Sequence, residues 1–181
     1  MNKYAILFGI LLVGLSFAQP APSGIGWNVY VQTCCQYRYV DSLLQYGYNY
    51  YALYDNSCET SYKGFMSESN RIGMIMFGGF IPNGLDRYYY DMENACAKGE
   101  GTQECLAAKQ SFYARAAFAR ASFNDAKIYY YVETAQALKD NKKYDKDCST
   151  TRATTLLAFP YAMDAYNRCK ADPEDACFRV T

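Results

Sequence analysis

The residues of this sequence that are best suited to chemistry are its eight cysteines, since the chain contains no histidine. Histidine is the commonest general base, proton carrier and zinc ligand in proteins, so its absence removes the usual means of hydrolytic and zinc chemistry. An even number of cysteines in an exported chain is most simply explained by four disulfides. The candidate disulfide residues are Cys34, Cys35, Cys58, Cys96, Cys105, Cys148, Cys169 and Cys177.

Other features of the sequence give little support to catalysis or to cofactor binding. No G-x-S-x-G, phosphate-binding or dinucleotide-binding motif is present, and a cysteine nucleophile would leave an odd thiol. Asp140, Asp145 and Asp147 could bind calcium, but they lie among lysines and lack EF-hand spacing. A hydrolase that uses paired carboxylates stays a minor alternative. We therefore expect a protein that is not an enzyme and that has no cofactor and no metal site.

The first 18 residues indicate export from the cell. Lys3 precedes an unbroken apolar run at residues 5–15, and Ser16 and Ala18 place small side chains where signal peptidase cleaves. We expect a signal peptide at 1–18 and a secreted, extracellular protein. A spanning helix needs about 20 apolar residues, so membrane insertion is disfavoured. The formal net charge of zero argues against a nucleic-acid partner, which needs a basic surface.

Apolar side chains that recur every three or four residues predict an all-α fold. We expect a disulfide-braced bundle of four to five helices in a single domain at 29–181, preceded by a flexible lead-in at 19–28. The first helix is expected at 29–56; a strand is the alternative there, because tyrosines alternate at 46–50 and Gly47 weakens a helix.

Four further helices are expected along the rest of the domain. Three of them are expected at 62–77, 85–97 and 149–168. The fourth, which precedes the last of these, runs from an N-cap at Thr102 to a charged connector at 140–147. Glycines at 99 and 101 end the helix before Thr102. A bend is expected at Asn124–Asp125 and a kink at Pro160, because proline lacks the amide hydrogen that an α-helix needs.

An internal similarity between two cysteine pairs bears on how the disulfides connect. Residues 91–96 read Asp-Met-Glu-Asn-Ala-Cys and residues 164–169 read Asp-Ala-Tyr-Asn-Arg-Cys, and a second cysteine follows each after a short polar loop. Local bridges Cys96–Cys105 and Cys169–Cys177 are therefore plausible, although coincidence is about as plausible. A ring between the neighbours Cys34 and Cys35 would be strained, so these two should bond to two distant partners and tie the first helix to two others.

Tyrosine is the most unusual part of the composition, with 20 residues. Tyrosine combines a large apolar ring with a polar hydroxyl, which suits mixed cores and binding surfaces alike. The clusters at 88–90 and 129–131 cannot point to one helical face, so some of these hydroxyls must be exposed. Candidate residues for a ligand groove or for oxidative cross-links are Ile72, Met76, Phe77, Tyr88, Tyr89, Tyr90, Tyr129, Tyr130 and Tyr131.

Three cysteine-containing stretches resemble an insect family of secreted proteins. The stretches are Cys35, Tyr37, Tyr46, Tyr50, Tyr54 and Cys58; Cys96, Cys105 and Ala108; and Cys148, Thr154, Tyr166 and Cys169. Their order and spacing are similar to those of the family that contains the tsetse midgut EP protein, a domain of unknown function. The resemblance implies a secreted helical bundle in gut, saliva or haemolymph, without catalytic residues.

These observations lead to one expected function and one alternative. The first is a secreted binding or interaction protein, in which a groove lined by the 72–80 stretch and by tyrosines holds a small apolar or aromatic ligand. The alternative is an extracellular structural or matrix protein whose exposed tyrosines become cross-linked.

Overall fold

The computed structural model describes residues 24–54, 62–78, 83–143 and 149–177, and within them the chain is entirely helical or loop, with no strand. The helices are α1 (Ile25–Tyr54), α2 (Tyr62–Phe77), α3 (Leu85–Cys96), α4 (Gln103–Lys143), α5 (Ser149–Ala171) and α6 (Pro173–Cys177). The expected all-α, disulfide-braced bundle is confirmed. The expected ranges at 62–77 and 85–97 differ from α2 and α3 by at most one residue.

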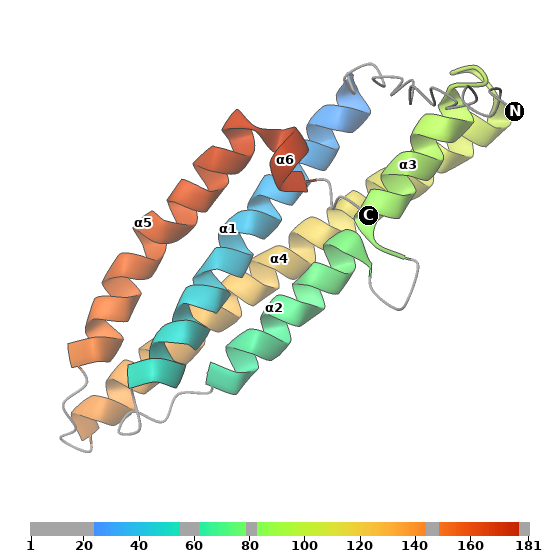
Figure 1. Ribbon diagram of the computed structural model, residues 1–181. Helices are drawn as coiled ribbons and strands as arrows, with labels where there is room; N and C mark the ends of the chain where they lie inside the picture. The colour runs from blue at the N-terminus through green and yellow to red at the C-terminus, as the bar shows by residue number, and fades with distance from the viewer. Residues whose placement is uncertain (1–23, 55–61, 79–82, 144–148, 178–181) are drawn as a thin grey trace, which may run out of the picture.

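Helix α1 is the central element of the bundle (Figure 1). It packs against α5 on one side and against α2 and α4 on the other, and it also contacts α3 and α6. Its side chains Tyr30, Val40, Leu43 and Leu44 are almost completely buried. Helix rather than strand is therefore confirmed for the described part of the expected 29–56 range, which ends at Tyr54, because this stretch buries side chains at helical spacing among several other helices.

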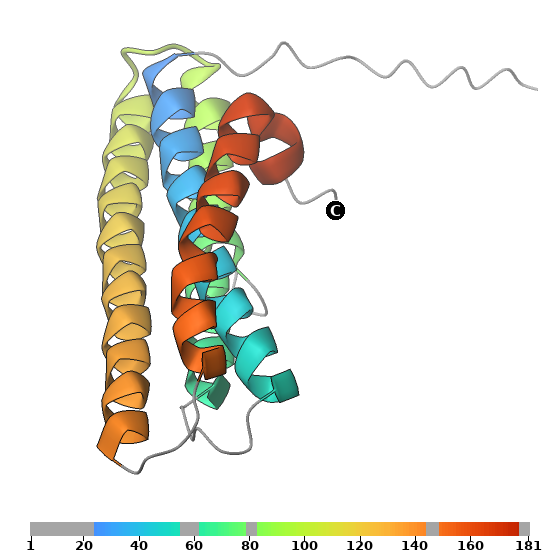
Figure 2. The ribbon, with the colours of Figure 1, turned by 90° about the vertical axis from the view of Figure 1, so that its left-hand side faces the viewer.

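Helix α4 has 41 residues, about 60 Å of helix, and α2 and α3 lie one after the other along it. Its buried face carries two alanines, Ala116 and Ala119, between the phenylalanines Phe112 and Phe123. Alanine allows close approach of the neighbouring helices, and the aromatic rings fill the remaining space. Figure 2 shows α4 at one edge of the bundle, with the other helices on one side of it only.

The predicted start of α4 is confirmed by a capping hydrogen bond. The Cys105 amide donates to Thr102 Oγ1 at 3.2 Å, which satisfies one of the free amides of the first turn. Gly99 in the preceding turn has φ +140°, a backbone conformation that favours glycine. The turn is further closed by the Cys96–Cys105 disulfide, with a Cα–Cα distance of 4.6 Å, as the sequence suggested.

Several boundaries were predicted wrongly. The expected lead-in at 19–28 overlaps α1, which already begins at Ile25; Trp27 packs near Tyr30 and Tyr89, with ring centroids 6.0 and 5.9 Å away. Helix α4 continues through Asn124–Asp125 and on to Lys143, inside the expected connector. Asn124 and Asp125 are exposed, so no packing requirement opposes the helix there.

The C-terminal end of the chain also differs from the expectation. Helix α5 contains Pro160 and extends three residues past the predicted end, to Ala171. The short α6 was not predicted, although Pro173 at its first position and Glu174 and Asp175 in its first turn are favourable residues for a helix start.

Candidate functional site

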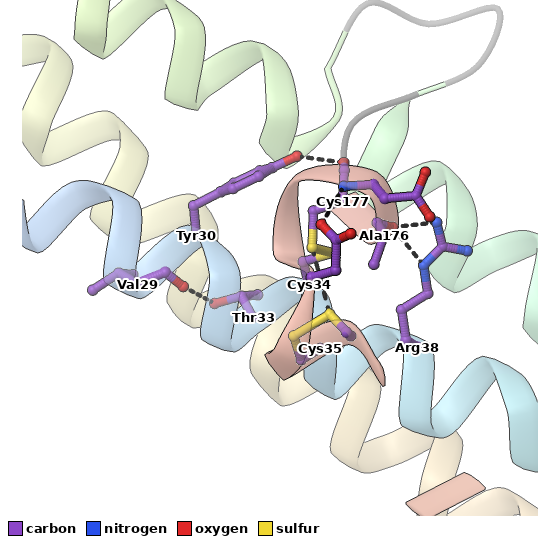
Figure 3. Close-up of a disulfide and its surroundings, with 11 residues drawn as sticks. Val29, Tyr30, Thr33, Cys34, Cys35, Arg38, Ala176 and Cys177 are labelled. Carbon is purple, nitrogen blue, oxygen red and sulfur yellow. Dashed lines mark hydrogen bonds between the residues drawn. A yellow bond between two sulfur atoms is a disulfide. The ribbon is translucent and has the colours of Figure 1, made fainter. Parts of the chain in front are cut away.

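Two disulfides join adjacent residues of α1 to the two C-terminal helices (Figure 3). Cys34 is bonded to Cys177 of α6, with a Cα–Cα distance of 5.9 Å, and Cys35 is bonded to Cys169 of α5, at 5.5 Å. Neighbouring side chains on a helix point about 100° apart, so they reach different partners. The prediction that Cys34 and Cys35 tie the first helix to two others is confirmed. We call this pair of bridges the disulfide clamp.

The suggested local bridge Cys169–Cys177 is wrong. The two sulfurs lie 3.6 Å apart, but each is bonded to a cysteine of α1. The loop between α5 and α6 is so short that it brings both cysteines to the same place on α1, where each meets a closer partner. Cys58 and Cys148 lie outside the described residues.

Backbone carbonyls of α6 accept hydrogen bonds from two side chains of α1. The Tyr30 hydroxyl donates to the Cys177 carbonyl at 3.0 Å, and Arg38 donates from Nε at 2.8 Å and from its Nη2 to the Ala176 carbonyl (Figure 3). These carbonyls belong to the last residues of a five-residue helix, where no intrahelical donor remains. Burial raises the pKa of the Tyr30 hydroxyl far above its usual range, so it stays a neutral donor.

Beside the clamp, α1, α5 and α6 enclose an open cleft of about 560 Å³. Most of its walls are small side chains: Ser42 from α1, Ala165, Cys169 and Ala171 from α5, and Ala176 from α6. The disulfides fix the spacing of these helices, and side chains of this size do not fill the space that is left. We call this space the α1–α5–α6 cleft.

Charged side chains of both signs stand at the cleft. Arg38 comes from α1, Arg168 from α5, and Asp172 and Asp175 from the α5–α6 corner. Arg168 is held by Asp164 at 2.9 Å, while Arg38 is fixed by the Ala176 carbonyl. The cleft thus combines a small, largely apolar wall with a rim that carries balanced charge. Such a site can bind an amphipathic small molecule.

The groove expected around residues 72–80 is not formed by the residues that the structure describes. Ile72 and Met76 have exposed fractions of 0% and belong to the core, and Phe77 is half-buried against the Tyr37 ring. They face inward because α2 packs between α1 and α4, so this part of the groove prediction is wrong. Residues 79–82 lie outside the described chain.

The six candidate tyrosines divide by position rather than gathering at one site. Tyr89 and Tyr130 are buried, with exposed fractions of 1%, and Tyr88 and Tyr129 are half-buried. Tyr90 and Tyr131 are exposed at 44% and 40%. The expectation that each cluster presents some tyrosine to solvent is confirmed, while buried Tyr89 and Tyr130 cannot be surface cross-linking residues.

The sequence analysis did not identify the residues that line the α1–α5–α6 cleft, because alanines around a cysteine carry no distinctive sequence signal.

The outward face of α4 is unusually poor in charge. Of its exposed residues from Leu106 to Gln136, Asp125 alone is charged. The face also carries large apolar side chains, and we call it the outer α4 face. Its apolar and aromatic members are Leu106, Tyr113, Phe118, Ile128, Tyr131 and Val132.

Three sulfurs of the clamp lie close enough together to suggest a metal site. Those of Cys34, Cys169 and Cys177 lie within 4.8 Å of one another. All three are bonded in disulfides, however, and zinc binds the thiolate form of cysteine. While both disulfides are intact, the clamp therefore offers no thiolate ligand to a metal ion. The closeness of the three sulfurs bears instead on exchange between the two disulfides.

The fold and the clamp together define the chain as a disulfide-braced helical bundle. Comparison with protein-family models, with curated proteins and with solved structures finds no match. In the described part of the chain, none of the helices combines the length and the apolar character that crossing a membrane requires.

Proposed function

We propose that the protein is a secreted, non-enzymatic binding protein that holds a small ligand in the α1–α5–α6 cleft. The observation that carries the proposal is the cleft itself, whose volume of about 560 Å³ is in the range of small-molecule sites. The expected signal peptide supports delivery outside the cell, where disulfides persist. If the likeness to the insect secreted family holds, the protein would work in gut, saliva or haemolymph.

The chemistry of the cleft favours an amphipathic ligand. Ala165, Cys169 and Ala176 provide apolar contacts, while Arg38 and Ser42 can donate hydrogen bonds to a polar group. A cleft held open by covalent bridges needs little reorganisation on binding, which lowers the entropic cost of association. We therefore expect a ligand with an apolar body and a polar or anionic head that reaches Arg38.

The test is native mass spectrometry of the secreted wild-type protein and of two tryptophan variants, each incubated with an extract of the source tissue. Ala171 is exposed and ends α5 at the cleft wall, so Ala171→Trp should occupy the cleft without disturbing the core. For comparison, Ala135→Trp places the same ring on the outer α4 face, away from the cleft. A mass excess in the wild type and in Ala135→Trp, absent from Ala171→Trp, supports the proposal. Wild-type protein without any bound small molecule contradicts it.

A second candidate function is assembly into an extracellular matrix through tyrosine cross-links. It is favoured by the exposure of Tyr90, Tyr113, Tyr131 and Tyr161, at 37–49%. Two of these, Tyr113 and Tyr131, belong to the outer α4 face, where an apolar surface suits contact between molecules. Dityrosine in hydrolysates of native material would support this function, and its absence would leave the ligand-binding proposal as the better one.

A further inference from the structure

The two disulfides of the clamp lie close enough together for a sulfur of one to react with a sulfur of the other. Cys169 Sγ and Cys177 Sγ are 3.6 Å apart, although they belong to different disulfides. Thiol–disulfide exchange proceeds when a thiolate attacks a sulfur of a neighbouring disulfide. The sulfur of either C-terminal cysteine, once released as a thiolate, would therefore have a disulfide sulfur directly beside it.

We propose that the clamp is a single redox unit, in which reduction of one bridge opens both connections to α1. When an external thiol reduces Cys34–Cys177, the Cys177 thiolate attacks Cys169 Sγ. A Cys169–Cys177 bond forms, the Cys35–Cys169 bond breaks, and its electron pair leaves on Cys35 Sγ, which takes a proton from water. The external thiol is oxidised to its disulfide, so two electrons convert two bridges into one bridge and two thiols.

Reduction that begins at the other bridge leads to the same product. If Cys35–Cys169 is reduced first, the Cys169 thiolate attacks Cys177 Sγ and displaces Cys34. In both routes Cys34 and Cys35 end as thiols on α1, and a Cys169–Cys177 bond spans a sequence separation of eight residues. A loop of similar separation, nine residues, is closed by Cys96–Cys105, so bridges across short polar turns are sterically accessible in this chain.

The entry point for the reductant is set by burial and by helix length. All four clamp sulfurs belong to residues with exposed fractions of 0–1%, so the intact bridges are shielded. Cys177, however, ends a five-residue helix that is held to α1 by the bridge and by the hydrogen bonds from Tyr30 and Arg38. Short terminal elements open locally at lower free energy than the core. Local opening of α6 therefore exposes Cys34–Cys177 first.

The consequence is that α5 and α6 lose both described covalent links to α1 in one event. Cys169, Arg38 and Ala176 line the α1–α5–α6 cleft, so the event would also change the shape of the cleft. The redox inference does not depend on the ligand-binding proposal, because it concerns only the sulfurs and can be tested without a ligand.

The direct test is limited reduction of the folded, full-length secreted protein with dithiothreitol, followed by alkylation and peptide mapping. Among the clamp cysteines, we expect the first two thiols to be alkylated at Cys34 and Cys35, with Cys169 and Cys177 joined in a bridge; reduction of the more exposed Cys96–Cys105 bridge is followed separately in the same peptide map. Alkylation confined to Cys34 with Cys177, or to Cys35 with Cys169, after incubation at about pH 8 overturns the proposal, since thiolates form readily near their pKa of about 8.5.

A variant tests the exchange step without any reductant. Cys34→Ala leaves Cys177 as a free thiol beside the Cys35–Cys169 bridge, and exchange should move the free thiol to Cys35 in a measurable fraction of molecules. Cys96→Ala is the matched control: it frees Cys105, which is outside the clamp cluster, so the thiol should remain on Cys105. If Cys177 stays the only alkylated residue in Cys34→Ala, the exchange does not occur. Should that variant fail to fold, limited reduction of the wild type still decides the question.

Discussion

The rings of Tyr30 and Tyr89 stack in the core with their centroids 4.7 Å apart, but their hydroxyls differ in hydrogen bonding. The Tyr30 hydroxyl donates to the Cys177 carbonyl, 147 residues away in the sequence. The buried Tyr89 hydroxyl has no hydrogen-bond partner among the described residues. The Tyr30 hydroxyl thus helps to position α6, whereas the Tyr89 hydroxyl is removed from water without a hydrogen bond that would compensate for the loss.

Removal of these two hydroxyls should therefore have opposite consequences. Tyr30→Phe leaves the Cys177 carbonyl without its donor and should lower the free energy of unfolding by about 1–2 kcal/mol. Tyr89→Phe removes a hydroxyl that is desolvated and unpaired, so it should be neutral or slightly stabilising. Denaturant unfolding of both variants under non-reducing conditions measures the difference. Equal destabilisation by the two substitutions would contradict the assignment of the hydrogen bond.

Gly47 explains why the first helix was difficult to predict. A Cβ added there would lie 3.0 Å from the rings of Phe65 and of Tyr130, both of which are almost completely buried. Glycine is therefore kept inside α1 because α2 and α4 approach the helix closely. Gly73 in α2 is different, since an added Cβ would meet only the Tyr37 hydroxyl, at an ordinary 3.5 Å.

Alanine substitutions at the two glycines should separate packing from helix propensity. Alanine is favoured over glycine inside a helix by about 1 kcal/mol, so Gly73→Ala should stabilise by up to that amount. Gly47→Ala gains the same propensity but overpacks two rings that are enclosed in the core, which costs about 1–3 kcal/mol, so a net loss of stability is expected. Thermal unfolding of both variants and of the wild type measures the change in stability that each substitution causes. Stabilisation by Gly47→Ala would mean that the Phe65 and Tyr130 rings can shift.

The sequence predicted the elements that depend on local signals. The periodic apolar stripe, the Thr102 N-cap and the Gly99 turn are properties of neighbouring residues, and the structure places α2, α3 and the start of α4 accordingly. The pairing of Cys34 and Cys35 with two separate, distant cysteines also followed from local geometry, because adjacent side chains on a helix diverge. The signal peptide and secretion remain predictions.

The features that sequence analysis missed depend on tertiary contacts. Cys169 and Cys177 are neighbours in space, as expected, but α1 supplies a partner for each, and no local pattern can show that. Ile72 and Met76 looked like groove residues because their stretch is apolar and rich in glycine, whereas the packing of α2 against α1 and α4 buries both side chains in the core. The cleft arises from alanines in α5 and α6, and alanine is equally common on a helix surface.

The two clamp bridges should stabilise the protein in a strongly non-additive way. Each alone closes a loop with a sequence separation of 143 or 134, which the chain-entropy model values at about 5 kcal/mol. Once one bridge is closed, the other closes only a short path through residues 169–177, worth about 2.5 kcal/mol. Removing either bridge should therefore cost about 2.5 kcal/mol, and removing both about 7.5 kcal/mol.

This prediction can be checked with paired alanine variants. The comparison needs Cys34→Ala/Cys177→Ala, Cys35→Ala/Cys169→Ala and the fourfold variant, each measured by denaturant unfolding. Pairwise removal avoids the free thiols that would allow exchange within the clamp. Costs that simply add would indicate that the two bridges constrain the unfolded chain independently, contrary to their adjacent positions on α1.

Stability should fall steeply in alkaline solution because buried tyrosines resist ionisation. Burial raises the pKa of Tyr30, of Tyr39 and of Tyr89 well above the ordinary tyrosine value of about 10. Below about pH 10 these hydroxyls are protonated in both states, so the stability is fully present. Above that pH the unfolded chain releases protons that the folded protein retains, and each such tyrosine lowers the free energy of unfolding by about 1.4 kcal/mol per pH unit. Unfolding measured at stepped pH, with tyrosinate absorbance as a second signal, tests this. The slope should become shallower in Tyr30→Phe, because this substitution removes one of the buried hydroxyls.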